Sequence, residues 1–270
     1  MIATSTETLI ARVTSGRRAK RMVAILDLVA ERGTISLADL LETLSISAAT
    51  ARRDLAELAE QNLILRTHGG ASAVDRGREI PVALRDTRFQ DAKRTIAKAM
   101  VKRLPAERHV IALSGGTTTA SVARELATHR DIAVVTNSLT IAGLLSGYPD
   151  VRVVMTGGFL RPQSLELVGA LAENTFNSVN VGTAIVGADG VSASAGVTTH
   201  DETEARTNHA MVAKAQRAVV VADGSKIGRV ALAQIADIDK ISMLITDKSA
   251  DPEALSEIRA AGVEVVIADA

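Results

Sequence analysis

Two adjacent arginines, Arg52 and Arg53, are the side chains whose type and position best fit a chemical task in this sequence. They lie in a predicted helix that begins after the capping residue Ser47 and runs to about Gln61. A guanidinium on an exposed helix donates paired hydrogen bonds to guanine in the major groove of DNA, or it binds phosphate. The pattern therefore predicts a helix that reads double-stranded DNA.

The apolar residues of this helix indicate which side faces solvent. Ala51, Leu55 and Leu58 share one side at helical spacing, and Ala49 and Arg53 lie roughly opposite. Small residues thus surround a guanidinium on the exposed side, so the helix backbone can approach a groove closely. The alternative interpretation is an ordinary surface helix that carries two arginines.

Neighbouring elements favour the DNA-binding interpretation. Upstream, apolar periodicity predicts helices over residues 17–33 and 37–44, and downstream residues 63–65 and 71–74 predict a hairpin. Three helices and a hairpin make a winged helix-turn-helix, whose hairpin reaches an adjacent phosphate or the minor groove. The expected DNA contacts are Arg17, Arg18, Ser36, Ser47, Ala49, Thr50, Arg52, Arg53, Arg66, His68 and Gly69.

Composition limits the other classes of protein. Aromatic residues make up only 1% of the 270, which argues against single-stranded nucleic acid as a ligand because base stacking needs aromatic side chains. There is no Cys, and the five His show no metal-ligand spacing, so neither a metal nor a cofactor is expected. No apolar run is long enough to cross a membrane, and no signal peptide is apparent, so we expect a cytoplasmic protein. The formal net charge of +0 means that DNA binding must depend on local basic clusters.

The chain divides into four expected parts. A disordered tail over residues 1–16 precedes the DNA-binding domain at 17–74, a linker at 75–81 and an effector-sensing, oligomerising α/β domain at 82–270. In the last part, short apolar strands alternate with helical segments, which favours a mostly parallel sheet with helices on both faces. The strands are expected at residues 109–113, 132–135, 151–155, 183–186, 217–222, 242–246 and 263–268.

A glycine turn follows the first of these strands and opens a helix. Glycines there let the backbone bend tightly, and the amide groups and threonine hydroxyls form a cradle for an anion such as phosphate. A tight structural turn is the alternative. The turn is not a Walker loop because no Lys follows the glycines, and the dinucleotide-binding spacing of glycines is absent. Its residues are Ser114, Gly115, Gly116, Thr117, Thr118 and Thr119.

Three further polar residues follow other strands, at the edge where parallel sheets bind ligands. Asp189 either accepts hydroxyl hydrogen bonds or caps a turn, and Asn137 either binds a ligand or caps a helix. Lys226 either pairs with phosphate or is a surface lysine. With the glycine turn they complete the expected effector site, which has no catalytic residue. Asp201, Glu202 and Glu204 are expected to support a helix N-terminus, where negative charge is favourable.

These motifs resemble the DeoR family of bacterial transcriptional regulators. The wing pattern Leu-x-Arg-x-His-Gly-Gly-Ala is present over residues 63–71 with one extra residue before Arg66, and similarity continues over roughly residues 17–250. The sequence departs from the family at Ala51, where Ile is usual, and at Ser114, where many members have Asp. The family's helix pattern is matched by Ser47, Thr50, Arg52, Arg53, Asp54 and Leu55.

The resemblance implies both a fold and a function. It implies a sensor domain like ribose-5-phosphate isomerase and glucosamine-6-phosphate deaminase, a phosphorylated sugar as effector, and repression of carbohydrate metabolism genes. One winged helix buries little surface, so two copies are expected on a double-stranded operator and the chain is expected to be a homo-oligomer. The alternative is a sugar-phosphate isomerase or deaminase that carries a DNA-binding domain. That chemistry needs a positioned general base, and no closely spaced acid–base group stands out in the sequence.

Overall fold

The computed structural model describes residues 16–74, 79–86, 88–105, 109–129 and 131–269. The chain forms two compact units, Met1–Arg88 and Phe89–Ala270. The tail expected at residues 1–16 falls outside the described residues except for Gly16, and most of the linker expected at 75–81 also falls outside them. No helix among the described residues is long and apolar enough to cross a membrane.

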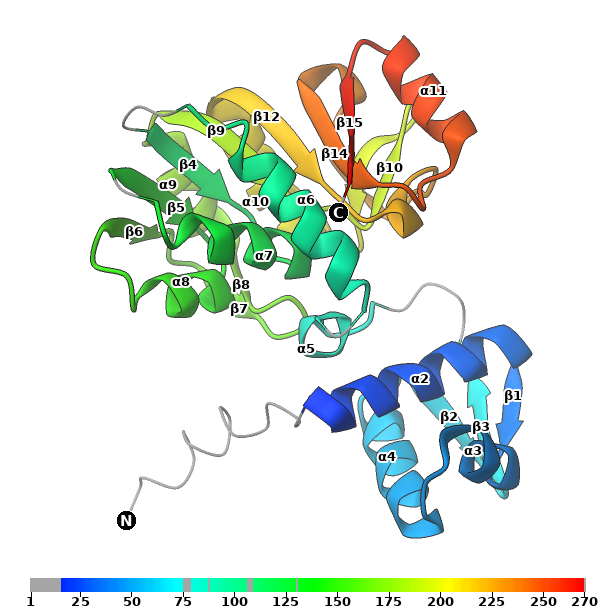
Figure 1. The fold of residues 1–270 in the computed structure, drawn as a ribbon. Helices are drawn as coiled ribbons and strands as arrows, with labels where there is room; N and C mark the ends of the chain where they lie inside the picture. The colour runs from blue at the N-terminus through cyan, green and yellow to red at the C-terminus, as the bar shows by residue number, and fades with distance from the viewer. Residues whose placement is uncertain (1–15, 75–78, 87, 106–108, 130, 270) are drawn as a thin grey trace, which may run out of the picture. The chain divides into compact units, whose positions relative to one another are not determined.

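The first unit is a winged helix-turn-helix. Its helices pack around a core that includes Met22, Ile25, Leu40 and Leu58, and its small sheet has the strand order β1-β3-β2 (Figure 1). The expected three helices and hairpin are therefore confirmed, whereas β1 was not foreseen. The elements are α2 (Gly16–Arg32), β1 (Thr34–Ser36), α3 (Leu37–Leu44), α4 (Ala48–Glu60), β2 (Ile64–Thr67), β3 (Gly70–Ala73) and α5 (Val82–Arg85).

Local backbone requirements explain where these elements end. Asn62 has a φ of 54° directly after α4, which is the left-handed stop expected for this residue type. Gly70 begins β3, and a Cβ there would lie 2.0 Å from the carbonyl oxygen of Ile35. Only glycine therefore lets β3 pack this closely against β1.

The boundary between the units differs from the expected one. We expected the second domain to begin at residue 82, but the short helix α5 belongs to the first unit, which extends to Arg88. Leu84 is buried in the first unit's core, and Ile80 packs against that core. A helix of one turn has too few residues for its apolar periodicity to show which of the two cores it packs against.

The second unit is built on a seven-stranded sheet in which every neighbouring pair is parallel, in the order β15-β14-β12-β9-β4-β5-β6. The seven strands expected from the sequence are those seven. Its elements are α6 (Gln90–Val101), β4 (His109–Leu113), α7 (Thr117–Leu126), β5 (Ile132–Thr136), α8 (Leu139–Leu145), β6 (Val151–Met155), β7 (Phe159–Arg161), β8 (Glu166–Val168), α9 (Ala170–Asn177), β9 (Val181–Val186), β10 (Gly190–Ser192), β11 (Gly196–Thr199), α10 (Glu202–Lys214), β12 (Ala215–Val221), η1 (Gly224–Lys226), β13 (Ala233–Ala236), η2 (Ile238–Lys240), β14 (Met243–Asp247), α11 (Pro252–Ala260) and β15 (Glu264–Ala268).

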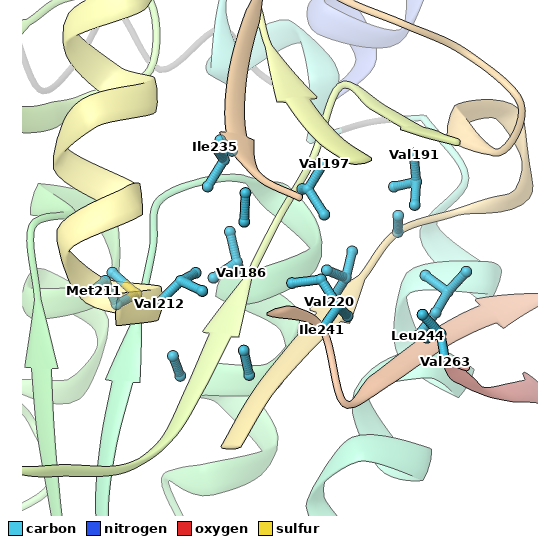
Figure 2. Close-up of a cluster of buried hydrophobic side chains, with 14 of the residues drawn as sticks. Val186, Val191, Val197, Met211, Val212, Val220, Ile235, Ile241, Leu244 and Val263 are labelled. Atoms are coloured by element: carbon cyan, nitrogen blue, oxygen red, sulfur yellow. The ribbon is translucent and has the colours of Figure 1, made fainter. Parts of the chain in front are cut away.

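Alternating side chains cover the two faces of this sheet. Val219 and Val221 join the core beneath α6, α7 and α8, while Val220 joins the core beneath α9, α10 and α11 (Figures 1 and 2). The core beneath α9, α10 and α11 also includes Val191 from β10 and Val197 from β11, as Figure 2 shows. Helices therefore lie on both faces, as expected for an α/β domain.

Two small antiparallel sheets complete the unit and were not foreseen. They are the hairpin of β7 and β8 and the sheet β10-β11-β13. The hairpin attaches to the loop after β5, because Leu139 N–H donates to Leu165 O (3.0 Å) and Leu167 N–H donates to Asn137 O (2.7 Å). The hairpin therefore lies beside the carboxyl ends of the parallel strands, where the effector site is expected.

Candidate DNA-binding surface and effector site

Helix α4 presents both expected arginines to solvent. Arg52 and Arg53 are exposed, and neither forms a hydrogen bond or ion pair with another described residue. Ala51, Leu55 and Leu58 on the other side are buried in the unit's core. The guanidinium groups therefore lie on a rigid helix and are available for contact with DNA.

Hydroxyl residues fix the start of both helices of the motif. Ser36 caps α3 by accepting the Asp39 N–H at 3.1 Å, and Ser47 caps α4 by accepting the Thr50 N–H at 3.3 Å. The Ser47 and Thr50 hydroxyls also lie 2.9 Å apart. These bonds set the entry of α4, and Ser47 remains exposed beside Ala49 at the tip of the helix.

The wing presents its turn to solvent. Arg66, His68 and Gly69 are all exposed, and Arg66 lies opposite Ala71 in the ladder between β2 and β3. Leu37 N–H donates to Gly69 O at 2.6 Å, which ties the wing to the start of α3. The wing and the motif helices are thus held in one orientation.

The basic start of α2 divides into two roles. Arg17 is exposed, in keeping with a phosphate contact. Arg18 instead forms ion pairs with Glu57 and, at 3.5 Å from Nε to Oδ1, with Asp54. Arg21 also binds the buried Asp54 through Nε and through Nη2 at 3.2 Å. Arg18 therefore joins α2 to α4, and we do not retain it among the proposed DNA contacts.

In the second unit, two hydroxyl groups of the glycine turn form hydrogen bonds with backbone groups of the protein. The Ser114 hydroxyl accepts the Gly187 N–H at 3.0 Å and donates to Gly115 O at 3.1 Å. The Thr119 hydroxyl donates to Gly115 O at 2.8 Å. Both side chains are buried, so these two hydroxyls shape the turn rather than offering a free donor.

Helix α7 begins directly after this turn. Its N-cap is Gly116, whose φ of 114° suits glycine and which provides no side-chain cap. The first N–H groups of α7 therefore face the turn with no capping side chain among the described residues. A helix start of this kind is electrostatically suited to an anion.

A continuous polar network connects the turn to the other strand ends. Gly115 N–H donates to Glu166 Oε1 at 2.6 Å. Glu204 accepts from Thr199 at 2.7 Å and from Arg161 at 3.1 Å. The Thr199 hydroxyl lies 3.2 Å from Asp189 Oδ2, and Lys226 Nζ donates to Asp189 Oδ1 at 3.2 Å. The structure thus brings together the expected residues Gly115, Asp189 and Lys226.

Charge and burial shape this network. Burial first, and then the charge and hydrogen bond of Glu204, raise the pKa of Glu166 well above its usual value. Burial also acts to raise the pKa of Asp201, but the Glu204 N–H and Arg161 outweigh it, so that pKa is lowered. Asp201 is the N-cap of α10, as expected. The surroundings of Glu166 therefore favour its neutral form, and those of Asp201 favour its ionised form.

Asn137 contributes an unfilled acceptor at the end of β5. The residue is fully buried, and its Nδ2 donates to Asn208 Oδ1 at 3.4 Å. Its Oδ1 has no hydrogen-bond partner among the described residues. A buried unpaired carbonyl is unfavourable, so this atom is well suited to accept from a ligand hydroxyl.

Sequence reasoning did not foresee four members of the network. Arg161 and Glu166 come from the hairpin β7–β8, which was not predicted. Glu204 was expected to favour a helix N-terminus and was otherwise named only as an acid available to the enzyme alternative, and Thr199 was not considered. Both residues are buried and bonded to network members. A signal existed for Glu166, because an acid between Leu165 and Leu167 interrupts an otherwise apolar segment.

No group of three His, Cys, Asp or Glu side chains among the described residues is arranged to hold a metal ion. The network's cations are Arg161 and Lys226, and its other members donate or accept hydrogen bonds. The arrangement is therefore suited to binding a polar, hydroxylated ligand that also carries an anionic group.

Comparison with protein families matches both units. Residues 21–76 match the DeoR-like helix-turn-helix domain, and residues 88–248 match the DeoR C terminal sensor domain. The fold and the site define a DNA-binding transcriptional regulator with a separate sensor domain. The chain belongs to the DeoR family, as its motifs indicated.

Similar proteins of established name are regulators. The chain is 39% identical over 249 residues to the HTH-type transcriptional regulator GlpR of Haloferax volcanii, covering 92% of this chain and 97% of that protein. It is 35% identical over 251 residues to a putative aga operon transcriptional repressor of Escherichia coli O157:H7 (92% and 93%). It is 32% identical over 231 residues to the glycerol-3-phosphate regulon repressor of Escherichia coli K12 (86% and 91%).

Among solved structures, ribose 5-phosphate isomerase A of Methanocaldococcus jannaschii is 21% identical, with a TM-score of 0.38. The match covers 51% of this chain and 54% of that one. The full-length sorbitol operon regulator SorC of Klebsiella pneumoniae is 12% identical, with a TM-score of 0.33 over 77% of this chain and 89% of that one.

Proposed function

We propose that this chain represses carbohydrate metabolism genes by binding an operator as a homo-oligomer, and that a small phosphorylated metabolite controls this binding. The observation that carries the proposal is the network at the carboxyl edge of the sheet, because Glu166, Glu204 and Thr199 link the glycine turn to Asp189 and Lys226. Relatives named as repressors of the aga operon and of the glycerol-3-phosphate regulon support the physiological role.

A phosphorylated compound is expected to stabilise the second unit, whereas its unphosphorylated counterpart is not. At a ligand concentration 100 times the dissociation constant, linkage gives about 2.7 kcal/mol. For a unit of this size that corresponds to a rise in melting temperature of roughly 5–11 °C. Calorimetry of the full chain with glycerol 3-phosphate, aldose phosphates and ketose phosphates, each against its unphosphorylated form, tests this.

The variant Lys226→Met tests where the phosphate binds. The variant loses a charge-assisted contact, and such bonds contribute about 1.5–3 kcal/mol. Its affinity for the phosphorylated compound that stabilises the wild type is therefore expected to fall by about tenfold or more. Lys240→Met is the matched control, because Lys240 is exposed and pairs only with its neighbour Asp239 among the described residues. Equal shifts with phosphorylated and unphosphorylated compounds would contradict a phosphate site.

Oligomerisation is proposed through the hairpin β7–β8 and the start of α9. Phe159 and Leu171 are 79% and 63% exposed, and Phe159 lies 3.7 Å from the position of a Cβ on the intervening Gly169. Large exposed apolar side chains mark interaction surfaces. A second copy is the expected occupant because the operator requires two winged helices.

Phe159→Asp is expected to shift the chain toward the monomer in sedimentation experiments, since a charge at the centre of an apolar interface is costly. Leu232→Asp is the control, because Leu232 is 78% exposed and lies outside this surface. A monomeric wild type, or a monomer produced only by Leu232→Asp, would overturn the assignment.

The alternative function is an isomerase or deaminase, which requires an accessible general base. Both carboxylate oxygens of Glu204 already accept hydrogen bonds, from Thr199 and Arg161. This occupancy favours a binding role over a catalytic one. The same phosphorylated compounds serve as the test, and conversion of any of them by the purified chain would favour the enzyme.

A further inference from the structure

The carboxyl group of Glu166 lies where an anion would be expected. Its Oε1 accepts the Gly115 N–H at 2.6 Å, and its Cδ lies 2.4 Å from the position of a Cβ on Gly115. Glu166 is 1% exposed, so the carboxyl fills this space. Gly115 precedes the uncapped start of α7, whose N–H groups and dipole favour negative charge.

Glu166 is not held there by a salt bridge. Among the described residues Arg161 pairs with Glu204 and Asp201, and Lys226 pairs with Asp189. The carboxyl group of Glu204 faces Glu166, and burial together with this neighbour raises the pKa of Glu166, which favours its neutral form. The hydrogen bond from the Gly115 N–H to Glu166 Oε1 is 2.6 Å long. A fully charged anion would interact more strongly with the N–H groups at the start of α7 than this carboxyl group in its neutral form does.

Asn137 supplies an independent sign that a ligand belongs beside this carboxyl. Its buried Oδ1 has no partner among the described residues. Asn137 follows Thr136, and Thr136 pairs with Leu113, the residue directly before the glycine turn. The backbone carbonyl of Asn137 accepts the N–H of Leu167, the residue next to Glu166. A hydroxylated anion at this strand edge would satisfy Asn137.

We propose that Glu166 is an internal ligand of the anion cradle at Gly115–Thr119 and that an anionic effector must displace it to bind. The inference rests on the proposed effector site and adds a mechanism to it. A phosphate oxygen and Glu166 Oε1 cannot both occupy the position in front of the Gly115 N–H, because Oε1 already lies 2.6 Å from that nitrogen. Displacement turns the Glu166 side chain away from Gly115 and alters the hairpin that carries it.

The backbone next to Glu166 is compatible with such a movement. Leu165 has a φ of 54°, a conformation that a bulky residue adopts only at an energetic cost. Among the described residues β7 pairs with β8 and with no other strand. The hairpin attaches to the loop after β5 through backbone bonds near Asn137 and Leu139, and to the start of α10 through the ion pairs of Arg161. A shift of the hairpin therefore need not break the seven-stranded sheet.

Inorganic phosphate is the probe, measured by calorimetric titration of the full chain at constant pH and ionic strength. The apparent affinity is proportional to the fraction of molecules in which Glu166 does not occupy the cradle. Because Glu166→Ala leaves the cradle open in every molecule, this variant is expected to bind phosphate at least about tenfold more tightly than the wild type. Glu166→Gln is expected to lie between them, since its amide oxygen still accepts the Gly115 N–H. Glu202→Ala is the control, because Glu202 is exposed at the start of α10. The affinity of this variant for phosphate should match that of the wild type.

Other outcomes separate this inference from the proposed function. Equal or weaker phosphate binding by Glu166→Ala overturns the inference, while a stabilising phosphorylated metabolite still upholds the effector site. Absence of phosphate binding in every variant also overturns it, and absence of any stabilising metabolite overturns the effector site itself.

A measurement on the wild type avoids dependence on the folding of variants. Hydrogen exchange with saturating phosphate is expected to slow at residues 115–119 and to quicken at residues 159–168. Slowing at the turn with unchanged exchange in the hairpin would overturn displacement of Glu166.

Discussion

Arg53→Ala is expected to abolish specific operator binding while leaving the fold intact. Arg53 is exposed and lies opposite the buried Ala51, Leu55 and Leu58, so its removal changes no core contact. A lost bidentate contact to guanine costs about 1–3 kcal/mol per half-site. For two half-sites the affinity should fall by a factor between roughly 30 and more than 10,000.

The measurement is a fluorescence anisotropy titration with an operator selected from a random DNA pool, at fixed salt. Arg52→Ala is expected to weaken operator and random DNA alike and to reduce the salt slope by about one, if it mainly binds phosphate. Arg32→Ala is the control, because Arg32 is an exposed arginine at the end of α2 outside the proposed contacts. Unchanged operator affinity of Arg53→Ala would reject α4 as the reading helix.

Local apolar patterns were sufficient to predict most of the fold. The bounds of β4 and β6 agree with the predicted residues 109–113 and 151–155, because each strand is a short segment of mostly apolar residues. The short strands of the hairpin β7–β8 were missed, because three residues carry too little periodicity to be recognised. Such strands are determined by tertiary pairing, here with each other and with the loop after β5.

The candidate effector site was predictable only in part for a related reason. Parallel strands end at one edge, and this rule led to Asp189 and Lys226, whose side chains are bonded to each other in the structure. The rule does not apply to side chains from a crossing hairpin, so Arg161 and Glu166 escaped it. It also cannot tell a free hydroxyl from one bonded to the backbone, as is the case for Thr119.

The sequence also carries a signal for the partners of Asp54, the acid on the buried side of α4. Asp54 lies three residues after Ala51 and four before Leu58, so helical spacing places it on the buried side. A carboxylate there requires a partner, since a buried unpaired charge is strongly unfavourable. The nearby basic residues Arg18 and Arg21 were the available partners, and the structure pairs both with Asp54.

Asp54→Asn is therefore expected to destabilise the winged helix strongly. Asp54 is 1% exposed and accepts from Arg21 Nη2 at 3.2 Å, in addition to the bond from Nε. Breaking a buried ion pair costs about 3–5 kcal/mol, and we expect about 2–3 kcal/mol because Arg21 and Arg18 retain some contact with water. The melting temperature of the first unit should fall by roughly 8–24 °C.

Calorimetry of the full chain measures this, with the transition of the second unit as an internal reference. Asp27→Asn is the matched control in the same unit, because Asp27 is 50% exposed and pairs with Arg88. Surface pairs of this kind contribute about 0–1 kcal/mol, so the control should shift the same transition far less. A shift no larger than that of Asp27→Asn would mean that the contacts of Asp54 with Arg18 and Arg21 do not hold α2 against α4.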